Sequence, residues 1–150
     1  AVRTLRIVGL YATPAVRRAT GKTMAYDQDA ENAAQRHASD ASVLLDHKRF
    51  DNAGYHYGLA AECAVKGSLL RSGVPRADAA IARLHFPQLS EAAIQSLSGR
   101  RATGLLKVLK RKSFMQGWDI RMRYASTGSV RQEQAERWRD DANAAIGELF

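Results

Sequence analysis

The chain has 150 residues, of which 45% are hydrophobic and 25% are charged, and its formal net charge is +8. These proportions are typical of one globular domain, and no run of apolar residues is long enough to cross a membrane. Walker-type loops, glycine-rich dinucleotide fingerprints and His-Glu-x-x-His helices are absent from the sequence, which excludes the common nucleotide-hydrolysing and metalloprotease classes.

The N-terminal segment, residues 1–23, differs in character from the rest of the chain. It contributes five basic residues and no acidic one, so only +3 of the net charge of +8 belongs to residues 24–150. Pro14 and Gly21 interrupt any long element there. We expect residues 1–23 to be a basic leader, either preceding the natural start at Met24 or docking on the domain as an arm.

Beyond this leader, apolar residues recur every three or four positions, which is the period of amphipathic helices. Asp51 is placed to cap one such helix, and Gly73 and Pro75 are placed to end it. The period of two that marks strands is absent after residue 24, so the sequence predicts an all-α, up-and-down bundle of about five helices. The expected helices span residues 29–47, 51–71, 87–97, 101–112 and about 135–149, with a helical turn at 78–84 and an irregular stretch at 113–129.

Several short motifs occur in order between the start of the second expected helix and the start of the last one. They are Arg49-Phe50-Asp51-Asn52-Ala53, Tyr55-His56, Ala60-Ala61-Glu62-x-Ala64-x-Lys66, His85-x-Pro87-x-Leu89, and Trp118 ahead of Arg123-Tyr124. In this order and spacing, over about residues 34–149, they resemble a HEPN (higher eukaryotes and prokaryotes nucleotide-binding) domain. The resemblance implies a helical bundle that usually forms homodimers and needs no cofactor.

Many HEPN proteins are toxins or defence ribonucleases of bacteria, and others are non-catalytic nucleotide-binding or scaffolding modules. Catalytic members carry an Arg followed shortly by a His near the Arg-Tyr segment, but no histidine follows His85 in this chain. The resemblance therefore predicts a cytoplasmic, non-catalytic module that binds nucleotide, RNA or a protein partner. An antitoxin or a nucleotidyltransferase is the partner protein that it implies.

The formal match to the ribonuclease motif is Arg49 with His56. In catalytic HEPN proteins the His serves as a base toward the ribose 2′-hydroxyl and the Arg stabilises charge on the phosphate. A ribonuclease with an atypical site, at Arg49 and His56 or around Arg121, is thus the alternative function, and a pure scaffold is a second alternative. His56 can equally be a packing residue.

The sequence contains no residue pattern that predicts a metal-binding site. Cys63 is the single cysteine of the chain, so an internal disulfide and a cysteine-only metal cluster are excluded. His37 and His47 fall on the first expected helix, but their separation is not the i, i+4 spacing of a helical metal site.

Charge gives the stronger functional signal, because no acidic residue occurs between Ala92 and Trp118. Basic residues recur there on one face of the expected helix, opposite its leucines, and aromatic residues lie nearby. Such a stripe is typical of a phosphate-rich ligand, although a solvated basic face with Trp118 in the core is the alternative. The expected binding residues are Arg100, Lys107, Arg111, Trp118, Arg121, Arg123 and Tyr124.

The second expected helix also carries structural signals. Glu62 and Lys66 are four residues apart and are expected to form an ion pair, with Arg123 as another candidate partner for Glu62. The Ala60-Ala61 step suits close helix packing. We expect a homodimer through this helix or the last one, because both carry more small and apolar residues than one bundle face needs.

Overall fold

A computed structural model describes residues 28–74, 79–99 and 102–150. Within these ranges the chain is helical and contains no strand, which confirms the all-α prediction. The leader expected at residues 1–23 and the expected binding residue Arg100 lie outside them. The elements are α1 (Ala30–Asp46), α2 (Phe50–Arg71), α3 (Ala79–Arg83), α4 (Gln88–Leu97), α5 (Thr103–Leu109), the 3-10 helix η1 (Ile120–Tyr124) and α6 (Gln132–Gly147).

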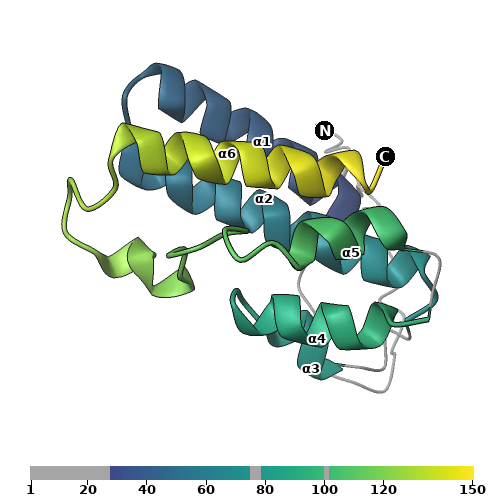
Figure 1. Cartoon of the computed structure of the whole chain (residues 1–150). Helices are drawn as coiled ribbons and strands as arrows, with labels where there is room; N and C mark the ends of the chain where they lie inside the picture. The colour runs from purple at the N-terminus through teal and green to yellow at the C-terminus, as the bar shows by residue number, and fades with distance from the viewer. Residues whose placement is uncertain (1–27, 75–78, 100–101) are drawn as a thin grey trace, which may run out of the picture.

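The three longest helices, α1, α2 and α6, pack together as the centre of the bundle (Figure 1). Asp29 caps α1 by accepting a hydrogen bond from the Asn32 backbone N–H at 2.9 Å. The shorter helices α4 and α5 contact each other, and they join the centre through α2 and α6 respectively. No helix among the described residues is long and apolar enough to cross a membrane.

The helix α2 is the most deeply buried element of the bundle. Ala53, Ala60, Ala61 and Ala64 have no exposed surface, since α1 and α6 pack around them. Small side chains let these helices approach closely, as the sequence predicted. The argument for a dimer through Ala60-Ala61 is wrong, however, because the same chain already covers both residues.

Two tryptophans fill the space that glycines of α2 leave open. A Cβ atom at Gly58 would lie 1.8 Å from the Trp118 ring, and one at Gly54 would lie 2.7 Å from the Trp138 ring. The Trp118 indole N–H donates to the Gly54 carbonyl at 3.1 Å. This interlock holds the connection between α5 and η1 against α2.

Asp51 acts differently from the expected helix cap. The helix α2 begins at Phe50, and its capping residue Arg49 makes no side-chain capping bond. The Asp51 carboxylate instead accepts from the backbone N–H groups of Gly128 at 2.7 Å and Val130 at 2.8 Å. Asp51 therefore fixes the loop ahead of α6.

Replacing Asp51 by Ala is expected to lower the free energy of unfolding by about 1–2 kcal/mol, because two charge-assisted hydrogen bonds are lost. Asp51→Asn keeps an acceptor oxygen and should lose less. Urea unfolding of the two variants measures the difference. Equal losses for Ala and Asn would contradict the role of the acceptor.

Candidate functional site

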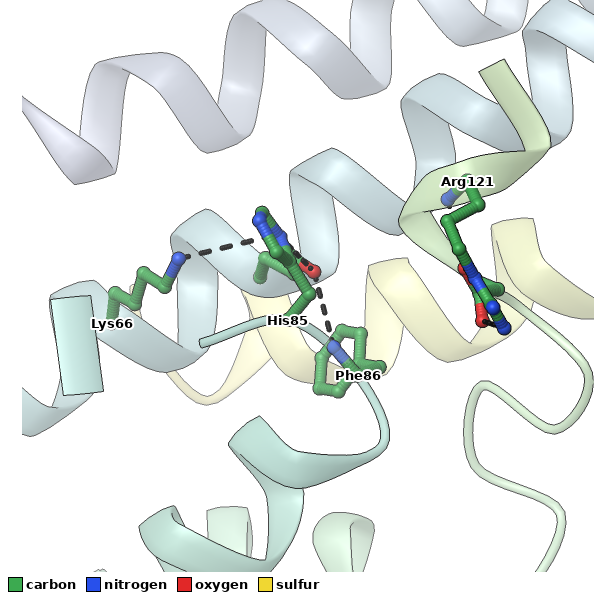
Figure 2. Close-up of polar contacts among 6 residues, drawn as sticks. Lys66, His85, Phe86 and Arg121 are labelled. Atoms are coloured by element: carbon green, nitrogen blue, oxygen red, sulfur yellow. Dashed lines mark hydrogen bonds and ion pairs between the residues drawn. The ribbon is translucent and has the colours of Figure 1, made fainter. Parts of the chain in front are cut away.

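Glu62, in the middle of α2, is a buried carboxylate with three partners. The residue is only 3% exposed. It accepts from His85 Nδ1 at 2.9 Å and from the Phe86 backbone N–H at 3.2 Å, and the Lys66 ammonium lies 3.9 Å away (Figure 2). The expected Glu62–Lys66 pair is confirmed. Arg123 is not a partner of Glu62, because its guanidinium lies 4.9 Å over the Tyr124 ring.

This cluster sets the chemistry of His85. Burial raises the pKa of Glu62, while the hydrogen bond from His85, the Lys66 charge and the Phe86 N–H act in the opposite direction. When Glu62 is ionised its carboxylate only accepts, and in that state His85 Nδ1 is the donor and Nε2 is left for other partners. The His85 side chain is 41% exposed. A carboxylate-oriented imidazole of this kind is suited to hydrogen bonding or proton transfer with a ligand.

A second charged pair, Asp119 with Arg121, borders the cluster. Asp119 accepts from the Arg121 guanidinium at 2.7 and 2.9 Å and from the Arg121 backbone N–H at 2.8 Å. These bonds lower the pKa of Asp119 to about 2, with His85 as a smaller cause. The Arg121 side chain is 83% exposed, and Figure 2 shows it on the η1 side of the cluster. Arg121 therefore offsets the Asp119 charge and presents a cation to solvent.

A groove of about 620 Å³ lies beside these residues. Its lining combines buried aromatic side chains, including Phe86, Phe114 and Trp118, with a run of three exposed cations at positions 110–112. Two acids, Glu91 and Asp119, also belong to the lining. The groove thus places positive charge over an apolar surface. The three cations are Lys110, Arg111 and Lys112.

The basic residues expected to share one helix face do not lie on a single helix. The helix α5 ends at Leu109 and Lys110 is its C-terminal capping residue, so Arg111 lies beyond the helix. Lys107 is exposed on α5 but does not line the groove. Lys110 and Lys112 line the groove but were not among the expected binding residues, because a helix continued to residue 112 places them off the expected stripe.

Trp118 is a core residue rather than a surface platform. It is 2% exposed, stacked on Tyr55 at 6.2 Å between ring centroids and met edge-on by Phe86 at 6.1 Å. The expectation that Trp118 stacks on a base is therefore wrong. Tyr124, by contrast, is 79% exposed beneath the Arg123 guanidinium, so these two expected binding residues lie at the surface.

Arg49 and His56 do not form a site in the described part of the chain. Arg49 is exposed at the start of α2. His56 is half-buried, with its Nδ1 atom 3.1 Å from the Nδ1 atom of His37 on α1 and its ring against Tyr55. Burial, followed by the nearby His56, lowers the pKa of His37. His56 is accordingly a packing residue engaged with another histidine.

Comparison of the chain with protein-family models, curated proteins and solved structures finds no match. The chemistry of the site therefore rests on its geometry. His85 is the main residue of the site that the sequence did not predict. The available signal was Glu62, an acid on an alanine-rich and hence buried helix face, which requires a hydrogen-bonding partner from another element.

Proposed function

We propose that this chain is a HEPN-like, non-catalytic module that binds RNA in the groove bordered by residues 110–112. The observation that carries the proposal is the run of three exposed cations that line the groove. Lys and Arg bind the phosphates of RNA, and Tyr124, at 79% exposed, offers an aromatic surface to an unstacked base. A homodimer, and a partner such as an antitoxin or a nucleotidyltransferase, stay predictions from the resemblance.

The size and charge of the groove both favour a nucleotide-containing ligand. Its volume of about 620 Å³ falls within the range of pockets that hold small organic ligands. Of the two acids in the lining, Asp119 is offset by its bonds to Arg121. The local field therefore stays positive, which attracts phosphates. A longer RNA adds contacts to the exposed Arg121 and Tyr124, which a single nucleotide lacks.

The double variant Lys110→Glu with Lys112→Glu is expected to weaken RNA binding at least about tenfold, because phosphate contacts are replaced by repulsion. The matched control is Lys107→Glu with Arg137→Glu, which reverses two exposed cations outside the groove lining. Fluorescence anisotropy with a single-stranded RNA oligomer measures both. Equal loss of RNA affinity in the two double variants would show that RNA does not bind at the groove.

The same assay separates RNA from a free nucleotide. For about three phosphate contacts on a single strand, log K should fall with log salt with a slope of about −2. A mononucleotide that displaces the oligomer at similar concentration would make the nucleotide the ligand. Tighter binding of the oligomer is the result expected here.

One observation favours RNA cleavage as a second candidate function: Glu62 binds His85 through Nδ1 and leaves Nε2 for a ligand, and His85 is near enough to the Asp119–Arg121 pair to contribute to the lowered pKa of Asp119. His85 Nε2 would take the proton of a ribose 2′-hydroxyl, and the 2′-oxygen would attack the adjacent phosphorus. The bond from phosphorus to the 5′-oxygen breaks and that oxygen takes a proton from water, leaving a 2′,3′-cyclic phosphate. Arg121 would stabilise the phosphate charge.

For cleavage, the decisive pair of variants is His85→Ala and His56→Ala. If the second candidate holds, wild-type protein cleaves RNA in the presence of a chelator, His85→Ala loses at least about a hundredfold, and His56→Ala keeps its rate. Denaturing gels of a labelled RNA measure these rates. Absence of cleavage by the wild type supports the non-catalytic module.

A further inference from the structure

The helices α1 and α2 bring two histidines together that lie 19 residues apart in the chain. His37 on α1 and His56 on α2 form a hydrogen bond between their Nδ1 atoms, which are 3.1 Å apart, and their ring centroids are 5.3 Å apart. Both residues are half-buried. A hydrogen bond needs one donor and one acceptor, so one Nδ1 atom must carry the hydrogen and the other must be unprotonated.

This geometry limits how many protons the pair can hold. When one proton is added, the donor ring becomes an imidazolium, and its Nδ1–H still points at the lone pair of the neutral ring. A second proton must bind to that lone pair, which places two N–H groups and two positive charges against each other across 3.1 Å. The folded pair therefore accommodates one added proton, whereas two separate imidazoles in the unfolded chain accept two.

The groups around the pair also disfavour a charge on it. Burial, followed by the charges of His56 and Arg36, lowers the pKa of His37, while Asp40 acts in the opposite direction. Among the described residues, none of the groups that act on His37 comes from α6, the other helix packed on α1. The Tyr55 ring contacts His56 at an angle of 77° between the ring planes. The surroundings thus supply one carboxylate and one opposing cation.

We infer that the contact between His37 and His56 is a pH-sensitive device, which joins α1 to α2 at neutral pH and opens when both imidazoles become charged. These two helices share the most extensive contact of the bundle, so acidification loosens its centre. Histidines of the unfolded chain titrate at about pH 6.5. Because the unfolded chain then binds more protons than the folded state, the free energy of unfolding is highest above this pH and decreases as pH falls below it.

Urea unfolding of a double-mutant cycle at about pH 7.5 and about pH 5, on either side of the histidine range, tests this inference. The cycle comprises wild type, His37→Asn, His56→Asn and the double variant, and it separates the pair from every other titrating group, Glu62 included. Asparagine keeps a polar side chain toward the remaining imidazole, so these variants are expected to fold.

The stabilising coupling between the two histidines, expressed as a ratio of unfolding equilibrium constants, should fall at least about tenfold from the higher pH to the lower one. The reason is that each proton by which the two states differ changes the unfolding equilibrium constant about tenfold per pH unit. The matched control is His47→Asn, because His47 is exposed at the end of α1 and contacts the Val43 carbonyl. That variant should keep the pH dependence of wild type.

The hydrogen bond itself is measured on wild-type protein. Two-bond proton–nitrogen NMR spectra of the histidine rings should show, at neutral pH, a protonated Nδ1 atom on one ring of the pair and an unprotonated one on the other. Unprotonated Nδ1 atoms on both rings would overturn the inference. A coupling that is equal at the two pH values, or stronger at the lower one, would overturn it as well. The device is independent of the groove and of its proposed ligand.

Discussion

Gly58→Ala is expected to lower the free energy of unfolding by about 3 kcal/mol, one of the largest effects of any single methyl group in this protein. The new Cβ would lie 1.8 Å from Trp118 Cε2 and 1.9 Å from Trp118 Nε1. The ring cannot move aside freely, because it is 2% exposed, packs on Tyr55 and Phe86, and donates to the Gly54 carbonyl. This clash outweighs the gain of about 1 kcal/mol that Ala brings to a helix interior.

The matched control for Gly58→Ala is Gly147→Ala. Gly147 is the last residue of α6, and a Cβ there meets nothing within 4 Å. We expect that variant to unfold at the wild-type urea concentration or slightly above it, by helix propensity alone. If Gly58→Ala were as stable as Gly147→Ala in the same urea titration, the close packing of Trp118 on α2 would be incorrect.

The second large effect is expected at Glu62. Glu62→Ala should lower the free energy of unfolding by about 3 kcal/mol, because the buried Phe86 N–H and His85 Nδ1 lose their acceptor, Lys66 loses its counter-charge, and a cavity remains. Glu62→Gln keeps one carbonyl acceptor and removes a charge that burial penalises. We therefore expect Glu62→Gln to be much less destabilised near pH 7. Urea unfolding of both variants measures the difference.

The free energy of unfolding should also depend on pH through Glu62, in a direction that its burial determines. Burial raises the pKa of Glu62 in the folded protein, so the folded state binds this proton more tightly than the unfolded chain does. The resulting stabilisation is complete below the unfolded pKa of about 4.3 and is lost as pH rises through the folded value. Wild type should therefore gain stability relative to Glu62→Gln as pH falls. A gain with rising pH would contradict the burial argument.

The first two helices of the bundle were predictable from apolar periodicity to within a residue, whereas the last, expected at about 135–149, is α6 at Gln132–Gly147. Expected helices at 29–47 and 51–71 correspond to α1 at Ala30–Asp46 and α2 at Phe50–Arg71. The helix expected at 101–112 was too long, because Lys and Arg have good helix propensity whereas α5 ends at Leu109. The segment beyond it is held on α6, where the Asp141 carboxylate accepts from the Met115 backbone N–H at 2.8 Å.

The candidate site was predictable only where its residues share one helix. The Glu62–Lys66 pair follows from i, i+4 spacing. The contacts of Glu62 with His85, and of His37 with His56, span 23 and 19 residues and depend on how one segment returns to pack on another. Helical periodicity carries no information on that return. The burial of Trp118 likewise depends on Gly58, which lies on a different element.

The interlock of glycine and tryptophan has a consequence for how this sequence can evolve. A side chain can be gained at position 58 only after the ring at position 118 has been replaced by something smaller, and the intermediate then carries a cavity against α2. The second pair, Gly54 with Trp138, imposes the same order. In diverging lineages the members of each pair should therefore change together, and a lineage that retains both tryptophans should retain both glycines.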